Sequence, residues 1–211
     1  MQYFRAFVES FGAAPLSLLA SPLPQDPIYQ YASGEYPLTE ESRARVFDYL
    51  QNQTLYTDDF GQIEQADFLL AFSFGDGEST NSKLASLVRD LTKQTSNLPL
   101  CLQQEIASHL ADINHFTIAD LDYQTTADVV ARAKSKKLGF NVIVVAQAWH
   151  AKRCIETCQS LGLKVVALRG VNHFPFDDPQ PWVRNPINWI IKESHRELAT
   201  GDEISQKYQL L

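Results

Sequence analysis

The segment from Asn141 to Arg153 limits the folds open to this chain more than any other part of the sequence. It begins with the β-branched run from Val142 to Val145 and passes at once into a polar cluster that opens an amphipathic pattern. A short apolar run followed directly by a helix is typical of a strand buried in a parallel sheet. The pattern predicts that His150 and Arg153 lie just past the carboxyl end of a strand. Open α/β folds bind ligands and anions at this position.

The same alternation of apolar runs and amphipathic stretches continues along most of the chain. Helical crossovers between buried strands require a mainly parallel sheet that is covered on both faces. We therefore expect an α/β fold with a doubly wound sheet of about five strands. The expected strands cover residues 67–72, 98–102, 115–118, 142–145 and 164–168.

The N-terminal part has a different character. Prolines at positions 15, 22, 24, 27 and 37 exclude long regular elements, and Thr39 is a candidate N-cap for a helix that carries Val46 and Leu50. We expect residues 1–65 to form a helical and extended appendage that packs on the core. Residues 66–211 are expected to form the α/β domain with a C-terminal helix.

Composition excludes some classes of protein. The net charge of -7 argues against nucleic-acid binding, and the largest basic cluster is the short run from Lys134 to Lys137. That short run suits a solvated helix C-terminus. Three cysteines favour a reducing compartment over a disulfide-stapled secreted protein. Glu9, Gly12 and Pro15 interrupt the apolar N-terminal stretch, so we expect no membrane anchor and a cytoplasmic location.

Three segments carry a resemblance to a known family: residues 123–128, residues 145–153 and residues 158–162 with the strand that follows them. They resemble the SanA, ElyC and YdcF group, a bacterial family known as domain of unknown function 218, over about residues 66–198. Near the fourth strand the family carries a small polar residue, then His, then Arg at fixed spacing. Gln147, His150 and Arg153 fit this pattern, with Gln in place of the usual Ser.

The chain also departs from the family pattern. Asp120 and Thr126 keep the acidic and Thr positions that precede the fourth strand, but Tyr123 and Val129 replace the usual Ser and Asn. The Gly-rich turns after the first two strands are only partly kept. The resemblance implies a Rossmann-like fold, charged residues suited to an enzyme and, for some members, a link to cell-envelope or murein metabolism.

His150 and Arg153 are the main site candidates. A neutral imidazole near pH 7 can move a proton, and a guanidinium can grip phosphate or carboxylate through two hydrogen bonds. Each has a purely structural alternative: His150 as a packed histidine bonded to a backbone carbonyl, and Arg153 as the ion-pair partner of an acidic side chain. Glu105, near the end of the second strand, is a second candidate for proton transfer or simply a first-turn charge.

Further ligand contacts are expected from the turns beside these residues. Gly75, Asp76 and Gly77 follow the first strand, where backbone N–H groups can approach a phosphate and Asp76 can touch a hydroxyl or metal; an ordinary βα turn is the alternative. Thr126 and Asp128 are also expected to bind ligand, although Asp128 with Thr125 has the form of a capping box. Gln147 completes the ligand-binding set.

A metal site is not expected. His150, Cys154 and Cys158 have helical spacing, but the cysteines better suit core packing. The sequence also lacks a Gly-x-Ser-x-Gly elbow and a P-loop.

The sequence leaves three functional hypotheses. The first is an enzyme that acts on a small anionic or nucleotide-bearing metabolite between the first and fourth strands. The second is a non-catalytic binding or regulatory module for a nucleotide-type ligand such as S-adenosylmethionine. The third is an envelope-assembly partner. The substrate, the cofactor and the oligomeric state stay open.

Overall fold

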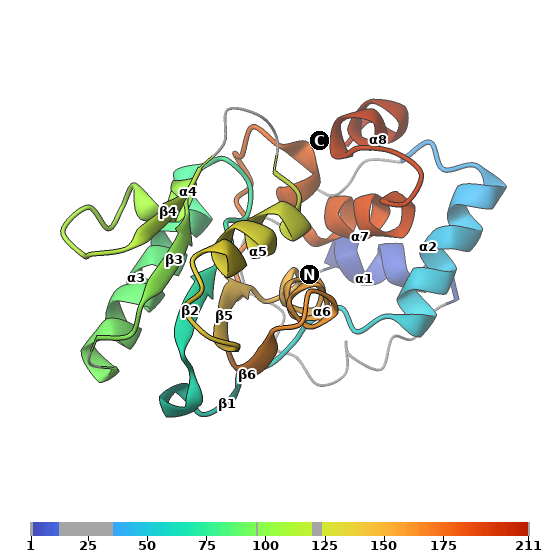
Figure 1. Ribbon diagram of the computed structural model, residues 1–211. Helices are drawn as coiled ribbons and strands as arrows, with labels where there is room; N and C mark the ends of the chain where they lie inside the picture. The colour runs from blue at the N-terminus through green and yellow to red at the C-terminus, as the bar shows by residue number, and fades with distance from the viewer. Residues whose placement is uncertain (1, 13–35, 96, 120–123, 211) are drawn as a thin grey trace. The chain divides into compact units, whose positions relative to one another are not determined.

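The computed structural model describes residues 2–12, 36–95, 97–119 and 124–210 of the chain (Figure 1). Four of the five N-terminal prolines, together with Asp120 and Tyr123, lie outside these residues. Contacts divide the chain into two compact units. The sheet unit covers Tyr56–His173, and the helical unit combines Met1–Leu55 with Phe174–Leu211.

A six-stranded sheet forms the sheet unit, in the order β1-β6-β5-β2-β3-β4. The strands are β1 (Phe60–Gly61), β2 (Phe68–Ala71), β3 (Leu100–Gln103), β4 (Phe116–Ile118), β5 (Asn141–Gln147) and β6 (Lys164–Val171). All pairs from β2 to β6 are parallel, and β1 pairs antiparallel with β6. The expected α/β class and mainly parallel sheet are confirmed, and all five expected strands are present. The sixth, β1, is two exposed residues long and has no apolar pattern to predict it.

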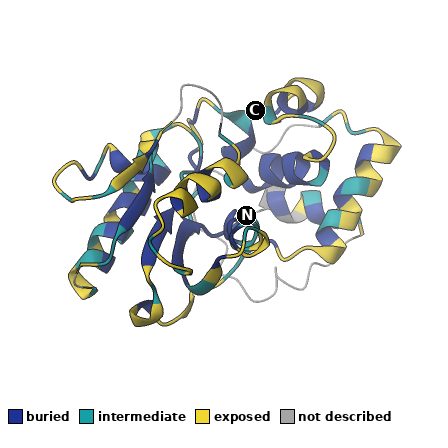
Figure 2. Ribbon diagram, in the orientation of Figure 1, coloured by how far each residue is buried: buried dark blue, intermediate teal, exposed yellow. Residues whose placement is uncertain are grey.

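Helices cover both faces of this sheet, which explains its continuous apolar strands (Figure 2). Phe68, Leu70 and Phe72 pack in one cluster with α5 (Thr126–Ser135) and α6 (Ala151–Ser160). Because side chains alternate along a strand, the equally buried Leu69 and Ala71 face the opposite side. On that side lie α3 (Glu78–Gln94) and the short α4 (Gln104–Ala107), while the 3-10 turn η3 (Ile63–Gln65) precedes β2.

The chain reverses its direction of travel across the sheet at β2. From β2 it moves outward through β3 to β4, and then returns to β5 on the other side of β2 before reaching β6. The loops that follow β2 and β5 therefore leave neighbouring strands and lead to helices on opposite faces. In parallel α/β sheets such a switch point is where ligands bind.

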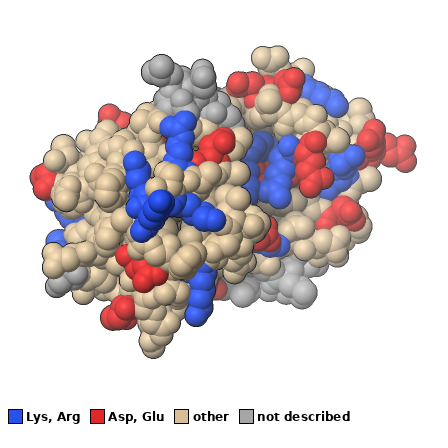
Figure 3. Space-filling model, viewed as in Figure 1, with Lys and Arg blue, Asp and Glu red and all other residues tan. Residues whose placement is uncertain are grey.

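Cations gather over α5 in the view of Figure 3. Arg132 and Lys134 lie in the last turn of this helix. Arg132 donates to the carbonyl of Ala119, and Lys134 donates to the carbonyl of Leu161. The basic run that begins at Lys134 thus lies at a helix C-terminus, as the sequence predicts.

The helical unit is organised around α7 (Pro186–His195), in which every residue except Ser194 is buried. Its other elements are α1 (Gln2–Glu9), α2 (Glu40–Asn52), the 3-10 turn η4 (Pro181–Val183) and α8 (Gly201–Tyr208). All four of these elements contact α7. The predicted cap of α2 is confirmed, because the side chain of Thr39 accepts from the backbone N–H of Ser42. The segment after residue 173 thus groups with the N-terminal residues, while the division at residue 65 expected from the sequence stays a prediction.

His195 lies at the junction of α2, α7 and α8. Its ring is 4.8 Å from that of Tyr208, whose hydroxyl lies 2.8 Å from Ser42 Oγ on α2. Nδ1 donates to the carbonyl of Ile191 at 2.9 Å, so Nε2 carries the lone pair. That atom is buried and has no hydrogen-bond partner among the residues that the structure describes. Burial lowers the pKa of His195 below 6.5. The nearby cations Arg45 and Lys207 lower it further, and Glu41 raises it by a smaller amount.

Asp67 fixes the start of β2 to the start of β5. Its Oδ2 accepts from the backbone N–H groups of Phe140 and Asn141, at 2.8 Å each. The adjoining Gly139 has φ +127°, and a Cβ on it would lie 2.4 Å from the Asp67 Cβ. Bonds from Asn141 and Phe140 hold the pKa of Asp67 below 3.8.

Among the described residues, no helix is long and apolar enough to cross a membrane.

We expect Asp67→Asn to lower the midpoint of urea unfolding at pH 7, because an amide accepts hydrogen bonds less strongly than a carboxylate. A depressed carboxyl pKa contributes stability above pH 3.8 that is lost as the pH falls through the folded value. The difference between wild type and variant should therefore shrink in unfolding curves taken from pH 5 to pH 3. Glu64→Gln, at an exposed position before β2, is the control and should leave the midpoint unchanged.

We expect the stability of the helical unit to fall below about pH 6.5, because the unfolded chain protonates His195 more readily than the folded one does. His195→Gln should flatten the pH dependence of thermal unfolding between pH 7.5 and pH 5. An unchanged slope in this variant would show that His195 does not titrate as described. His109→Gln, in the sheet unit, is the matched control.

Candidate functional site

The carboxyl ends of the parallel strands meet at one edge of the sheet unit. Five segments lie there: residues 72–77 after β2, 103–105 at the end of β3 and the start of α4, 124–128 at the start of α5, 148–150 after β5 and 172–173 after β6. Side-chain contacts connect these segments. The Ser73 N–H donates to Gln103 Oε1 at 3.0 Å, and the rings of Phe74 and His150 lie 6.1 Å apart.

His150 and Arg153 are in direct contact at the start of α6. Arg153 Nη2 lies 2.8 Å from His150 Nε2. A guanidinium can only donate, so Nε2 is the accepting nitrogen in this contact. Thr126 Oγ1, on α5, lies 3.4 Å from the same Nε2. Three of the predicted site residues are therefore brought together from two helices.

Gln147 positions this pair without facing it. Its side chain is fully buried, and Oε1 accepts from the N–H groups of Trp149 at 2.6 Å and His150 at 3.1 Å. Its Nε2 donates to the carbonyl of His173 at 3.3 Å. The amide thus shapes the loop between β5 and α6 and joins it to the end of β6. Its predicted contact with a ligand stays a prediction.

The turn at Gly75–Gly77 is held in place by a buried amide. Asn81 Oδ1 accepts from the Phe74 N–H at 3.0 Å. Its Nδ2 donates to the carbonyls of Gly75 and Gly77, at 3.1 and 2.8 Å. Gly75 has φ +74°, which favours glycine there, and Gly77 is the N-cap of α3. The three-residue turn is therefore rigidly placed at the start of a long helix.

Asp128 and Glu105 make their described hydrogen bonds to neighbouring residues of their own helices rather than to His150. Asp128 forms the expected capping box with Thr125, whose hydrogen bonds hold the Asp128 pKa below 3.8. Glu105 lies in α4, where Oε1 accepts from Gln104 Nε2 at 3.1 Å. Its Oε2 is buried and meets no hydrogen-bond partner within the described part of the chain. The roles assigned to Asp128 in ligand binding and to Glu105 in catalysis stay predictions.

The sequence analysis missed a second polar pair at this edge. Thr80 Oγ1, fully buried in the first turn of α3, lies 2.8 Å from His173 Nδ1. His173 follows a strand, which is the signal that identified His150, and it could have been found in the same way. Asn81 and Gln103 carry no comparable signal, because only the folded loops reveal their bonds.

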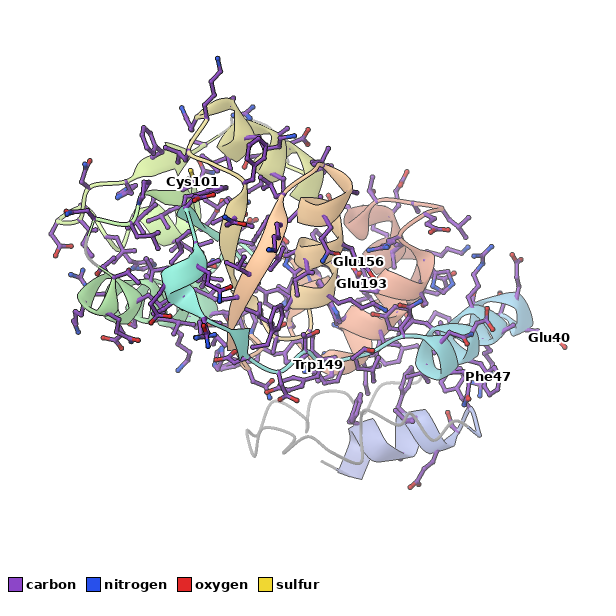
Figure 4. All side chains as sticks on the ribbon, turned by 60° about the horizontal axis from the view of Figure 1, so that its bottom comes forward. Glu40, Phe47, Cys101, Trp149, Glu156 and Glu193 are labelled. Carbon is purple, nitrogen blue, oxygen red and sulfur yellow. The ribbon has the colours of Figure 1, made fainter. Side chains whose placement is uncertain are left out.

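The cysteines of α6 lie in the core. Cys154 and Cys158 are fully buried in the cluster that α6 forms against the sheet, and burial raises the pKa of Cys158 to about 12. Figure 4 shows Cys101 on β3, Trp149 after β5 and Glu156 on α6. Within the described ranges, no group of three or more His, Cys, Asp or Glu side chains is placed to hold a metal ion.

Comparison with known proteins leaves the family open. No protein-family model matches the chain, and neither a curated protein nor a solved structure does so. The resemblance to the SanA, ElyC and YdcF group therefore rests on the sequence motifs alone.

Gln147→Leu should destabilise the sheet unit by about 1–3 kcal/mol, because it removes the side-chain bonds to the N–H groups of Trp149 and His150 and to the carbonyl of His173. The N–H of His150 keeps its 2.9 Å bond to the backbone carbonyl of Gln147. Chemical denaturation at pH 7 measures this loss. Gln159→Leu makes the same change at an exposed position of α6 and should alter stability by less than about 0.5 kcal/mol. Equal effects of the two substitutions would contradict the positioning role of Gln147.

Proposed function

We propose that the sheet unit is a Rossmann-like, doubly wound domain of the SanA, ElyC and YdcF kind. On this proposal it is an enzyme that acts on a small anionic or nucleotide-type metabolite, bound at the carboxyl ends of β2 and β5. The contact between Arg153 and His150 supports this most directly, because it joins a fixed cation to a neutral imidazole at the switch point of the sheet.

The chemistry of the pair suits anion binding coupled to proton transfer. Arg153 carries a permanent charge in the first turn of α6, where the helix dipole also favours an anion. An anion that attracts the guanidinium weakens its bond to His150, and Nε2 then becomes available to accept a proton from the ligand. Thr126 Oγ1, 3.4 Å away, can donate to the same ligand.

The turn after β2 completes the proposed site. Gly75 and Gly77 allow close approach of the backbone, and Asp76 is suited to contact a ligand hydroxyl. Phe74, whose ring lies 6.1 Å from that of His150, links this turn to the loop after β5. Glu105 is the second candidate for moving a proton.

One observation favours a binding module for a nucleotide-type ligand such as S-adenosylmethionine. Gln147 replaces the Ser expected from the family pattern, and its amide is engaged by backbone groups. The site therefore gains no hydroxyl from this position, which weakens the case for turnover. Such a module would use the same Arg153 for binding. We place either protein in the cytoplasm, which the three buried thiols support.

The test begins with native mass spectrometry of protein from its source, to detect a retained anionic metabolite. We expect Arg153→Gln to weaken its binding by about 10- to 100-fold, through loss of a charge-assisted bond. His150→Ala should keep most of the affinity and abolish turnover. Lys83→Gln removes an exposed cation of α3 and should change neither property.

The outcomes separate the hypotheses. Unchanged affinity in Arg153→Gln would overturn the proposed anion site. Binding that depends on Arg153 but is never followed by turnover of the bound metabolite would identify the binding module. Recovery of the protein in the membrane fraction would instead favour the envelope-assembly partner.

A further inference from the structure

The amino edge of the sheet, where the parallel strands begin, carries exposed cations together with exposed aromatic side chains. We call this group the amino-edge surface. It lies within the sheet unit, at the other end of the strands from the candidate site. Its members are Lys134, Lys136 and Lys137 at the end of α5, Lys164 at the start of β6, Phe116 at the start of β4 and Phe140 just before β5.

The lysines of α5 extend across this edge in two directions. Lys136 Nζ lies 5.5 Å from the centre of the Phe116 ring, on the outermost parallel strand. Lys134 donates to the carbonyl of Leu161, three residues before β6. The end of α5 therefore places positive charge from β4 to β6, and both lysines stay exposed.

Phe140 is held in an exposed position by its backbone. Its side chain is 70% exposed, more than any other large hydrophobic side chain in the described part of the chain. Its N–H donates to Asp67 Oδ2 and its carbonyl accepts from the N–H of Lys164, at 2.8 Å each. The ring cannot turn inward with its backbone unless these bonds break. The fold thus presents an apolar group to solvent beside a cation.

The sequence concentrates positive charge in this region. From Val129 to Ile155 the chain has six Lys and Arg and no Asp or Glu, although its net charge is -7. Figure 3 shows cations gathered over α5. The carboxylate of Asp67, beside Phe140, accepts two backbone N–H bonds. Because salt screens charges beyond about 8 Å at physiological ionic strength, acidic residues elsewhere do not cancel the local positive field.

We propose that the amino-edge surface docks on the anionic surface of a lipid bilayer. A lysine attracts lipid phosphate groups without a fixed geometry, and its hydrocarbon stem can lie along apolar surface. An exposed Phe among lysines can enter the boundary between headgroups and acyl chains. The lysines bring the surface to the bilayer, and Phe140 anchors it there.

An acidic segment of another protein is the main competing partner. Carboxylates in such segments are best held by arginine, whose planar group donates two parallel hydrogen bonds. Arg132, the arginine of α5, donates to the carbonyl of Ala119 instead. The exposed cations are lysines, and they surround an exposed aromatic ring. A bilayer, which has a charged layer over an apolar one, matches this combination better than an acidic segment does.

Docking at the amino edge leaves His150 and Arg153 at the opposite end of the strands. The bilayer contact therefore does not rest on the proposed function, and the two can hold together. It also needs no protein in the membrane, which distinguishes it from association with an envelope partner.

The test is co-sedimentation of the full chain with vesicles of pure lipid. One set contains phosphatidylcholine alone, and the other contains phosphatidylcholine and phosphatidylglycerol in equal parts. We expect binding to the anionic vesicles and little to the neutral ones. Raising NaCl from about 0.1 M to about 0.5 M should release most of the bound protein, because the contact is largely electrostatic.

Paired lysine variants measure the electrostatic part. Lys136→Gln with Lys137→Gln should weaken binding to anionic vesicles by about 10- to 25-fold, at roughly fivefold per lysine. Lys83→Gln with Lys93→Gln removes the same charge from exposed positions of α3 and is the matched control, which should leave binding unchanged. Because all four side chains are exposed, thermal unfolding should stay close to wild type.

A second variant measures the apolar part. Phe140→Ser should weaken binding by about tenfold and make the remainder more sensitive to salt, because the ring no longer enters the bilayer. Leu198→Ser, at a position that is 58% exposed in the helical unit, is the control and should have no effect.

The outcomes decide between the partners. Failure to bind anionic vesicles, equal binding to neutral ones, or equal losses in the variants and their controls would overturn the bilayer contact. Binding of poly-L-glutamate that depends on Lys136 and Lys137, without vesicle binding, would replace the bilayer by an acidic protein segment. Arg153→Gln should leave vesicle binding unchanged, so a failure of the anion site is seen separately.

Discussion

The parallel pairing of β2 with β5 is the constraint on which the other features of the sheet unit depend. Four residue pairs, from Phe68 with Val142 to Ala71 with Val145, join strands that are more than seventy residues apart in sequence. Because β3 occupies the other edge of β2, the two loops that leave β2 and β5 turn to opposite faces and meet at the carboxyl edge. Asp67 reinforces this pairing at the opposite end, through its bonds to Phe140 and Asn141. The meeting of Phe74 with His150, and so the whole candidate site, follows from that register.

The sequence predicted the strands well because burial on both faces leaves a continuous apolar run in each of them. Val142 to Val145 is the clearest case, and all four residues are fully buried. The same reasoning could not find β1, since Phe60 and Gly61 are exposed and pair only through their backbone with β6. Nor could it group residues 174–211 with the N-terminal helices, because the contacts of α7 with α1 and α2 join distant parts of the chain. Local periodicity specifies elements, whereas such long-range packing depends on complementary surfaces.

The difference between local patterns and long-range contacts also decides how much of the site could be predicted. His150 and Arg153 were predicted from their place after a strand, and their spacing of three on one helix brings their side chains into contact. The direction of the Gln147 amide could not be predicted, because it depends on where the backbones of Trp149 and His173 lie after folding. Thr80 and His173 meet across ninety-three positions of sequence and give no local signal as a pair. Residues that act through long-range hydrogen bonds are therefore those that sequence reasoning misses.

Several polar side chains at the carboxyl edge fix its loops, which connects the stability of the sheet unit with its candidate site. Asn81, Gln103 and Gln147 use their amides to fix loops, so removing them disturbs the fold before it can affect any ligand. The contact between His150 and Arg153 depends on these loops, because the Gln147 amide holds the turn that leads into α6. The amides that fix the loops thus keep the imidazole of His150 and the guanidinium of Arg153 in contact at this edge.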